Sequence, residues 1–382
     1  MYSDLINFIR DWYRTRDLIP LHEPRFTEID RQYVLDAIDS TFVSSVGEYV
    51  DRFEQALASY LGAEHAVATV NGTAALQVAL RLAGVGNGDE VITQPLTFVA
   101  TANAIAHNNG VPVFVDVNRE TLGLCPDALA RFLEQTALKK DKATINKISG
   151  RKIAAIVPMH TFGHPCRMKQ IMELADHWEI SVVEDAAESL GSRISTQHCA
   201  TFGALGVLSF NGNKTITCGG GGAIVTNDKN LAQRAKHLTT TARVPHKWEF
   251  SHDEIGYNFR MPNLNASLAC AQLGQLDGFL TDKRKLARAY ESFFKEAGWG
   301  KFVTEPQGCT SNYWLNAVMT ADLRQRDDLL TKTNESGIAT RPAWRLMPDL
   351  PMYKNCRKDD LKNARWLAER IVNLPSSVRI NV

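Results

Sequence analysis

The residues best placed for covalent chemistry lie in a glycine-rich stretch, residues 206–228 (GVLSFNGNKTITCGGGGAIVTND). GVLSF and AIVTN have the branched and aromatic composition of buried strands, and a single lysine, Lys214, stands between them before four consecutive glycines. A lysine amine whose environment keeps it neutral can form a Schiff base with an aldehyde or ketone. A solvated lysine in a glycine-rich hairpin turn is an equally good interpretation of this stretch alone.

A second candidate site follows the strand-like segment AVATV, where the small-residue turn NGTA (residues 71–74) opens a helix. Free N–H groups and the positive end of the helix dipole bind phosphate at such turns. The alternative is an ordinary strand-to-helix turn with Thr73 as its N-cap. Ser209, five residues before Lys214, adds a hydroxyl that can hydrogen-bond a phosphate near the lysine.

Two further strand ends carry an aromatic residue and a group of carboxylates. Phe98 follows VITQPL and can stack on a flat ring, although a single aromatic residue more often packs in the core. The segment EDAAE (residues 184–188) follows ISVV, and carboxylates there are costly to bury unless they meet a cation. Asp185 is therefore a candidate partner of a protonated ring nitrogen. The alternatives are a surface N-cap for the next helix and a solvated Glu188.

These features are a phosphate cradle, a stacking aromatic, a carboxylate for a ring nitrogen and a Schiff-base lysine. All four are requirements of one cofactor, pyridoxal 5'-phosphate. The carboxylate would keep the ring nitrogen protonated, and the released lysine would move a proton between substrate and cofactor. We therefore expect a pyridoxal phosphate enzyme with Lys214 as its catalytic residue.

The elements that position these residues alternate between short branched strands and helices from residue 66 onward. Such alternation implies right-handed crossovers and a mostly parallel sheet, which binds ligands beyond the carboxyl ends of its strands. We expect an α/β fold with a large domain over residues 1–250, including an N-terminal helical segment, and a smaller α+β domain over residues 251–382. A long helix is expected over about residues 265–297. The seven expected strands of the large domain are AVATV, VITQ, VPVFVD, IAAIVPM, ISVVED, GVLSF and AIVTN.

Composition and charge exclude several classes of protein. The 382 residues are 44% hydrophobic and 22% charged, as in ordinary globular domains, and the formal net charge of +1 gives no field that would attract nucleic acid or a membrane. The seven cysteines are scattered without a C-x-x-C pair, which argues against a disulfide framework and a metal site. No signal peptide or membrane-spanning run is apparent, so we expect a cytoplasmic protein.

The order and spacing of these motifs resemble those of the DegT/DnrJ/EryC1/StrS sugar aminotransferases, which are fold type I pyridoxal phosphate enzymes like aspartate aminotransferase. S-F-x-x-x-K followed by glycines, with E-D-A-A upstream and G-Y-N-[YF]-R-M downstream, is specific to this family. The similar segments cover nearly the whole chain: IPLHEP, STFVSSVGEYVDRFE, ATVNGTAAL, TQPLTFVATANAI, VEDAAESLGS, SFNGNK and GYNFRMPNLNA.

The resemblance implies a role for each matching residue. Lys214 would be the Schiff-base lysine, Asp185 the partner of the pyridine nitrogen and Phe98 the stacking residue. Glu188 stands where the family usually has glutamine or histidine in contact with the cofactor's phenolic oxygen, so the resemblance leaves its role open. The cofactor phosphate would be bound by Thr73, Ala74, Ser209 and, from the neighbouring subunit, Asn258. A homodimer with two shared active sites is therefore expected.

Three segments (MHTFGHPC, KHLTTTARVPHKWEF and TRPAWRLMPDLPMY) are similar to the subgroup linked to legionaminic acid and bacillosamine. That resemblance implies a UDP-linked 4-keto-6-deoxy-N-acetylhexosamine as acceptor, L-glutamate as amino donor and a 4-amino sugar nucleotide for surface glycans or glycoproteins as product. A diphosphate needs cations, and a histidine near the strand end can face the sugar, although a structural histidine is as good an interpretation. The candidate substrate contacts are His160, Arg243, His246, Lys247, Arg260, Arg341 and Arg345. Trp248, Trp314 and Trp344 could pack on the sugar or the base, with core packing as the default.

Two other interpretations remain open. One is a different pyridoxal phosphate reaction, on a 3-keto sugar or a dTDP- or GDP-linked sugar, or a dehydration. The family's dehydratases carry histidine where Lys214 stands, so the lysine is evidence against dehydration. The other is a non-catalytic binding or regulatory protein of the same fold, against which the filled cofactor positions argue.

Overall fold

A seven-stranded sheet forms the centre of the N-terminal two thirds of the chain. The structure is a computed structural model that describes residues 2–141 and 143–379. The strand order is β1-β11-β10-β7-β6-β2-β3; β11 is antiparallel to both of its neighbours and the other pairs are parallel. The strands are β1 (His65–Thr69), β2 (Glu90–Thr93), β3 (Val111–Phe114), β6 (Ile153–Val157), β7 (Ser181–Asp185), β10 (Leu205–Ser209) and β11 (Gly222–Thr226). The expected α/β fold with its seven strands is confirmed.

Helices cover both faces of this sheet, because its strands alternate their side chains between two apolar layers. Val67 packs with the layer of α4, α5 and α8, whereas its neighbours Ala66 and Ala68 pack with α3 and α9. Helices α6 and α7 cover the other half of the second face. The helices are α3 (Glu48–Leu61), α4 (Gly72–Leu82), α5 (Val99–His107), α6 (Pro126–Thr136), α7 (Met168–Trp178), α8 (Lys229–Thr239) and α9 (Asn263–Leu273).

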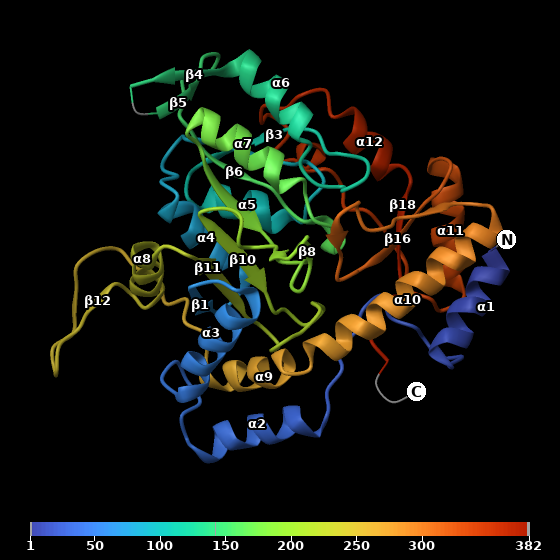
Figure 1. Cartoon of the computed structure of the whole chain (residues 1–382), viewed down its shortest axis with the longest axis horizontal. Coiled ribbons are helices and arrows are strands. Elements are labelled where there is room, and N and C mark those ends of the chain that lie inside the picture. The colour runs from blue at the N-terminus through green and yellow to red at the C-terminus, as the bar shows by residue number, and fades with distance from the viewer. Residues whose placement is uncertain (1, 142, 380–382) are drawn as a thin grey trace.

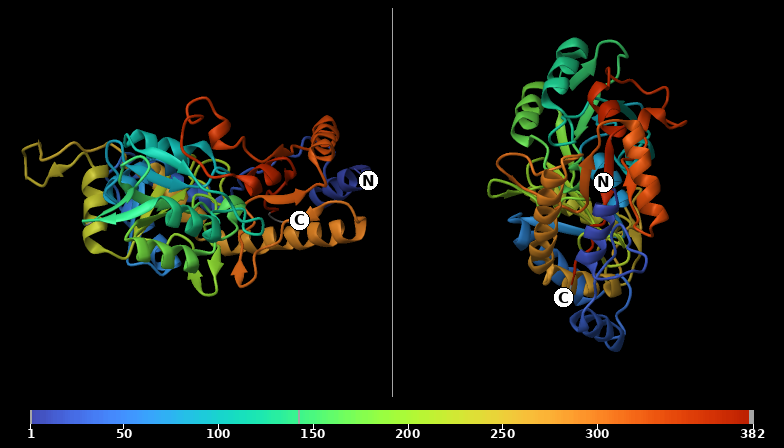
Figure 2. Two further views of the ribbon diagram at one scale, coloured as in Figure 1. Left: turned by 90° about the horizontal axis from the view of Figure 1, so that it is seen from above. Right: turned by 90° about the vertical axis from the view of Figure 1, so that its right-hand side faces the viewer.

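The C-terminal part is built on a four-stranded antiparallel sheet of order β14-β16-β18-β17. Helix α1 (Tyr2–Tyr13) joins this part, since Leu5 and Ile9 share an apolar cluster with Tyr290 of α10. Figure 2 shows the N-terminus beside the far end of α10. The division at residue 250 stays a prediction, and α1 crosses it. The elements are α10 (Leu276–Ala297), α11 (Leu323–Glu335), α12 (Lys362–Ala368), β14 (Lys301–Phe302), β16 (Asn316–Met319), β17 (Arg341–Pro342) and β18 (Ile371–Leu374).

The long helix expected over residues 265–297 is instead two helices, α9 and α10, separated by Gly274 and Gln275. Glycine has a low helix propensity, and Gln275 donates from Nε2 to both carboxylate oxygens of Asp30 on α2 (Glu28–Asp39) at 3.1 and 3.2 Å. The break lets α9 lie along α2 and α3 while α10 runs on to the C-terminal sheet (Figure 1). No helix in the described residues combines the length and the apolar composition needed to cross a bilayer.

Small strands complete the structure, and one pair of them projects away from the body. Strands β12 (Arg243–Val244) and β13 (Ser251–His252) form a hairpin at the end of the molecule opposite to α1 (Figure 2). Trp248 and Phe250 of the hairpin are 73% and 76% exposed. The remaining short elements are β4 (Ala137–Lys140), β5 (Ala143–Asn146), β8 (Arg193–Ile194), β9 (Gln197–His198), β15 (Cys309–Thr310) and the 3₁₀ turns Thr161–Gly163 and Met347–Asp349.

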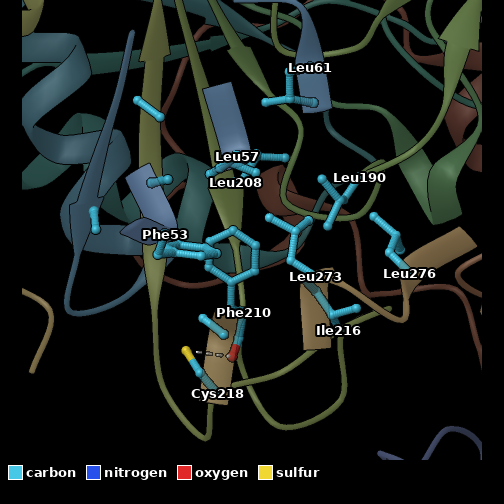
Figure 3. Packing of buried hydrophobic residues seen from close by; sticks show 14 of the residues in the cluster. Phe53, Leu57, Leu61, Leu190, Leu208, Phe210, Ile216, Cys218, Leu273 and Leu276 are labelled. Atoms are coloured by element: carbon cyan, nitrogen blue, oxygen red, sulfur yellow. Dashed lines mark hydrogen bonds between the residues drawn. The ribbon is translucent and has the colours of Figure 1, made fainter. Parts of the chain in front are cut away.

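The loop that carries Lys214 is anchored in the core at both of its ends. Phe210 directly follows β10 and meets Phe53 of α3 edge-to-face, with ring centroids 5.2 Å apart (Figure 3). Ile216 and Cys218, after the lysine, are buried in the same cluster. Burial of one phenylalanine side chain contributes about 1.5–3 kcal/mol, so these contacts hold the loop in one place.

We expect Gly222→Ala to destabilise the junction between β11 and α4. A Cβ at Gly222 would lie 2.5 Å from the carbonyl carbon of Asn71 and 2.7 Å from the nitrogen of Gly72. Because backbone must shift to make room, the free energy of unfolding in urea should fall by about 1–3 kcal/mol. Gly212→Ala is the control, since its Cβ would meet no atom within 4 Å. A Gly222→Ala variant as stable as the wild type would contradict this close approach.

Candidate active site

A cavity of about 340 Å³ opens at the carboxyl ends of the central strands, between the large sheet and the C-terminal part. Its walls come from the first turn of α4, the start of α5, the ends of β7 and β10, the Lys214 loop and two tryptophans, Trp314 and Trp344. Six of the predicted cofactor residues line it: Thr73, Phe98, Asp185, Glu188, Ser209 and Lys214.

Lys214 points into this cavity and not into solvent, since its side chain is only 13% exposed. Its Nζ lies 3.4 Å from Oε1 of Glu188 and 4.1 Å from the centroid of the Trp314 ring. An ammonium over an indole face is attracted by the ring quadrupole, most strongly where water is excluded. The alternative of a solvated lysine in a hairpin turn is therefore wrong.

Glu188 is buried beside the lysine. Its second carboxylate oxygen accepts a hydrogen bond of 2.9 Å from the backbone N–H of Phe162. Burial raises the pKa of Glu188 to about 7, against the opposing effect of the Lys214 charge. The carboxyl therefore changes its charge near neutral pH, and the alternative of a solvated Glu188 is wrong.

Asp185 ends β7 with both carboxylate oxygens oriented by hydrogen bonds. Thr101 donates from Oγ1 to Oδ2 at 2.7 Å, and the N–H of Ala187 donates to Oδ1 at 3.2 Å. These two donors hold the carboxylate in one orientation, in which it can face a protonated ring nitrogen. Thr101 was not among the residues predicted for the site, although a threonine four residues after Thr97, in an alanine-rich helix, is a usable sequence signal.

The first turn of α4 lies against the end of β10. The N-cap is Asn71, whose Oδ1 accepts from the N–H of Ala74 at 2.8 Å, so the alternative of Thr73 as N-cap is wrong. This bond also engages the N–H of Ala74, and the N–H groups of Gly72 and Thr73 are the first-turn donors that lack an intrahelical acceptor. A Cβ on Gly72 would lie 2.8 Å from Cβ of Ser209, so glycine is what lets the serine approach the turn.

Aromatic rings form another part of the cavity wall. Phe98 is 50% exposed, and its ring centroid lies 6.3 Å from that of Trp344, which in turn packs on Phe162 at 5.0 Å. A half-open aromatic surface in the same cavity as Asp185 suits the face of a flat heterocycle. The residues thus fit pyridoxal phosphate: first-turn donors and Ser209 for the phosphate, Phe98 for the ring, Asp185 for its nitrogen and Lys214 for its aldehyde.

The cavity also contains residues that the sequence analysis did not single out. Asn211 and Asn213 line it on either side of Gly212, and the carbonyl of Asn213 accepts from the indole N–H of Trp314 at 2.7 Å. Two asparagines within the three residues before the lysine are a usable sequence signal.

His160 lies outside the cavity, in the protein interior. Its Nε2 lies 3.1 Å from Oε2 of Glu184, and its Nδ1 accepts from the N–H of Cys166 at 3.0 Å. Glu184 also accepts from the N–H groups of Ala200 and Gly203. With both ring nitrogens engaged, His160 is placed as a structural histidine and not as a substrate contact of this cavity.

The other predicted substrate residues also lie outside this cavity. Arg243, His246 and Lys247 belong to the projecting hairpin, and Arg260 donates from Nε to Oδ1 of Asn258 at 3.0 Å, near its base. Two further candidates, Arg341 and Arg345, are exposed on the C-terminal part. The roles given to Asn258 and to these candidate substrate residues stay predictions.

The chain is similar in sequence and structure to known aminotransferases. Residues 24–382 match the DegT/DnrJ/EryC1/StrS aminotransferase family. A GDP-perosamine synthase of Escherichia coli O157:H7 is 36% identical over 359 residues, which cover 94% of this chain and 93% of the relative. A GDP-perosamine synthase of Vibrio cholerae is 34% identical over 94% of both chains. The crystal structure of the aminotransferase TlmJ from Streptoalloteichus hindustanus superposes with a TM-score of 0.85 at 28% identity, covering 94% of this chain and 93% of the other.

Lys214→Ala should remove transamination. The variant loses both the amine that binds the cofactor covalently and the base that moves the proton, so we expect the rate to fall by at least about 10³-fold. The measurement is 2-oxoglutarate formation from L-glutamate with a keto-sugar acceptor. Lys229→Ala, which replaces an exposed lysine of α8, is the control and should keep the wild-type rate. A comparable loss in both variants would contradict a special role for Lys214.

Glu188→Gln should stabilise the cofactor-free protein, and more so as the pH rises. Because burial raises the pKa of Glu188 from 4.5 to about 7, the native wild type binds more protons than the unfolded chain between these values. The stability contributed by Glu188 therefore decreases as the pH rises through this window, whereas glutamine has no proton to lose. The advantage of the variant, measured by urea denaturation at fixed protein concentration, should grow by up to about 3 kcal/mol between pH 5 and pH 8. A difference independent of pH would contradict the raised pKa.

Proposed function

Since the chain belongs to the DegT/DnrJ/EryC1/StrS aminotransferase family, and is thereby a pyridoxal phosphate-dependent sugar aminotransferase, we propose that it transfers the amino group of L-glutamate to a nucleotide-linked 4-keto-6-deoxy sugar. The observation that carries the proposal is the convergence of Lys214, Asp185 and the α4 turn on one cavity, in a chain whose relatives are named GDP-perosamine synthase.

Each group in the cavity has a place in this reaction. When bound, pyridoxal phosphate supplies a ring that accepts electrons from the substrate carbon while the amino group moves. Asp185, oriented by Thr101, would face the ring nitrogen as a carboxylate. Lys214 would hold and move the proton at its Nζ, next to the carboxyl of Glu188. Trp314 and Trp344 would limit the access of water to that proton.

We propose a GDP-linked acceptor in preference to the UDP-linked one expected from the sequence. Two relatives that align over 94% of this chain are named after a GDP sugar. The expected closeness to the legionaminic acid and bacillosamine subgroup stays a prediction, because neither of these relatives carries such a name. A 4-amino sugar nucleotide of either kind is suited to the synthesis of surface glycans.

A homodimer is part of the proposal. The hairpin with Arg243, His246 and Lys247 extends away from the body of its own subunit (Figure 2), where a second copy of the chain would meet it. Helix α2 and the following loop expose a large apolar surface, as expected of an interface. Its exposed residues are Ile29, Leu35, Ile38, Phe42, Val43 and Val46.

The choice of nucleotide can be tested with a matched pair of acceptors. We expect kcat/KM with a GDP-linked 4-keto-6-deoxyhexose to exceed that with the UDP-linked 4-keto-6-deoxy-N-acetylhexosamine by about 10²-fold, because a pocket that hydrogen-bonds one base rejects the other. Formation of the amino sugar nucleotide is followed by mass spectrometry, with L-glutamate omitted as the control. Equal or faster reaction of the UDP sugar would contradict the GDP proposal, and reaction of neither would contradict a 4-keto acceptor.

A further inference from the structure

Lys283 of α10 is a buried lysine that the proposed reaction does not use. It is only 1% exposed, although lysine is rarely buried completely. Its Nζ makes three hydrogen bonds: 2.9 Å to Nε2 of His22, 3.2 Å to the carbonyl of Trp314 and 2.7 Å to the carbonyl of Ser376. An ammonium has three N–H donors, so all three are used, and none of these partners is a carboxylate.

The three acceptors belong to segments that are far apart in the sequence. His22 lies in the extended arm between α1 and α2, and Ser376 lies in the segment after β18. The arm and this segment run side by side, since Ser376 donates its N–H to the carbonyl of Leu21 at 2.8 Å and Glu23 donates its N–H to Oγ of Ser377 at 3.0 Å. Nζ of Lys283 thus contacts the arm, the C-terminal segment and the active-site residue Trp314.

Trp314 connects this atom to Lys214. Its backbone N–H donates to Oδ1 of Asn312 at 2.8 Å, its indole N–H donates to the carbonyl of Asn213, and its carbonyl accepts from Lys283. Its ring then covers Nζ of Lys214 at 4.1 Å. Loss of the bond from Lys283 would leave a buried carbonyl without that donor, which favours a displaced backbone at Trp314.

His22 is close enough to Lys283 and Lys214 for both of their charges to affect its pKa. Burial lowers the pKa of His22, and the charges of Lys283 and Lys214 lower it further. His22 is therefore neutral near pH 7, and its Nε2 can accept a hydrogen bond from Nζ of Lys283. Burial also lowers the pKa of Lys283, to about 7. The interior position is therefore costly for a cation, and the three hydrogen bonds of the amine offset part of that cost.

We propose that Lys283 is a positioning residue of the active site, which fixes Trp314 over the amine of Lys214 and fastens the N-terminal arm to the same wall. The proposal rests on the catalytic function proposed for Lys214, but its test needs neither substrate nor turnover. The property that Lys283 would control is the access of a reagent to the amine of Lys214 in the cofactor-free protein.

The test is the rate at which N-hydroxysuccinimidyl acetate acetylates Lys214 in the full-length, cofactor-free protein, followed by mass spectrometry of the peptide that contains it. The rate is measured as a function of pH, because its plateau at high pH reports access to the neutral amine and its midpoint reports the charge state. In Lys283→Met we expect the plateau to rise roughly fivefold, the factor that corresponds to one net hydrogen bond of about 1 kcal/mol.

Tyr290→Phe is the matched control. Tyr290 lies two turns further along α10, is fully buried and donates to the carbonyl of Pro375 at 3.0 Å, so its loss loosens the same C-terminal segment without touching Trp314. Its plateau should stay within about twofold of the wild type, since it leaves all three bonds of Trp314 in place. An unchanged plateau in Lys283→Met, or an equal rise in Tyr290→Phe, would overturn the proposal.

A second pair of variants keeps the test decisive if Lys283→Met does not fold. Lys283→Gln retains N–H donors on a shorter side chain and should give a smaller rise. Trp314→Phe should raise the plateau by itself, and Lys283→Gln in that background should add nothing, because residues that act through each other are not additive. Additive effects of the two substitutions would show that Lys283 does not act through Trp314.

Discussion

The position of one amine, Nζ of Lys214, is the constraint on which the active site depends. The amine belongs to a side chain that is only 13% exposed, and it lies between the carboxyl of Glu188 and the ring of Trp314. A mostly buried amine in fixed contact with a carboxyl is placed to exchange a proton with a group bound in the same cavity. A lysine on a freely moving surface loop would have neither the fixed geometry nor this environment.

The fold supplies that geometry through the carboxyl edge of the large sheet. Asp185 and Ser209 end neighbouring parallel strands, and the N-terminus of α4 reaches the same edge because Gly72 and Gly222 allow close approach. One part of the cavity wall does not come from the large sheet. Trp314 and Trp344 come from the C-terminal part, whose apolar cluster also includes Leu96 and Phe162. The site is therefore built at a junction, and packing between the two parts sets its width.

The parts of this site that the sequence predicted are those encoded locally. Each of the seven strands was visible as a short branched run, and Lys214, Asp185, Ser209 and Phe98 were found because they end such runs or lie within five residues after them. Residue types at strand ends are a reliable signal where parallel strands share one ligand-binding edge.

The parts that it did not predict depend on contacts between distant segments. The hydrogen bond from Thr101 to Asp185 and the engagement of His160 by Glu184 become visible only once helix and sheet are assembled. The break between α9 and α10 depends on Asp30, more than 240 residues away in the sequence. Nothing in the local sequence marks Lys283 as buried, because its three partners come from three separate segments. The roles predicted for Asn258 and for Arg243 of the hairpin would require the proposed homodimer.

The most direct measurement is the visible absorbance of the purified wild-type protein with pyridoxal phosphate, before and after addition of L-glutamate. We predict a yellow absorption band that borohydride reduction fixes covalently on the peptide carrying Lys214, and that L-glutamate bleaches in the absence of any sugar. A band that L-glutamate leaves unchanged would contradict glutamate as the amino donor. A protein that acquires no band at all would contradict the central claim that Lys214 holds the cofactor.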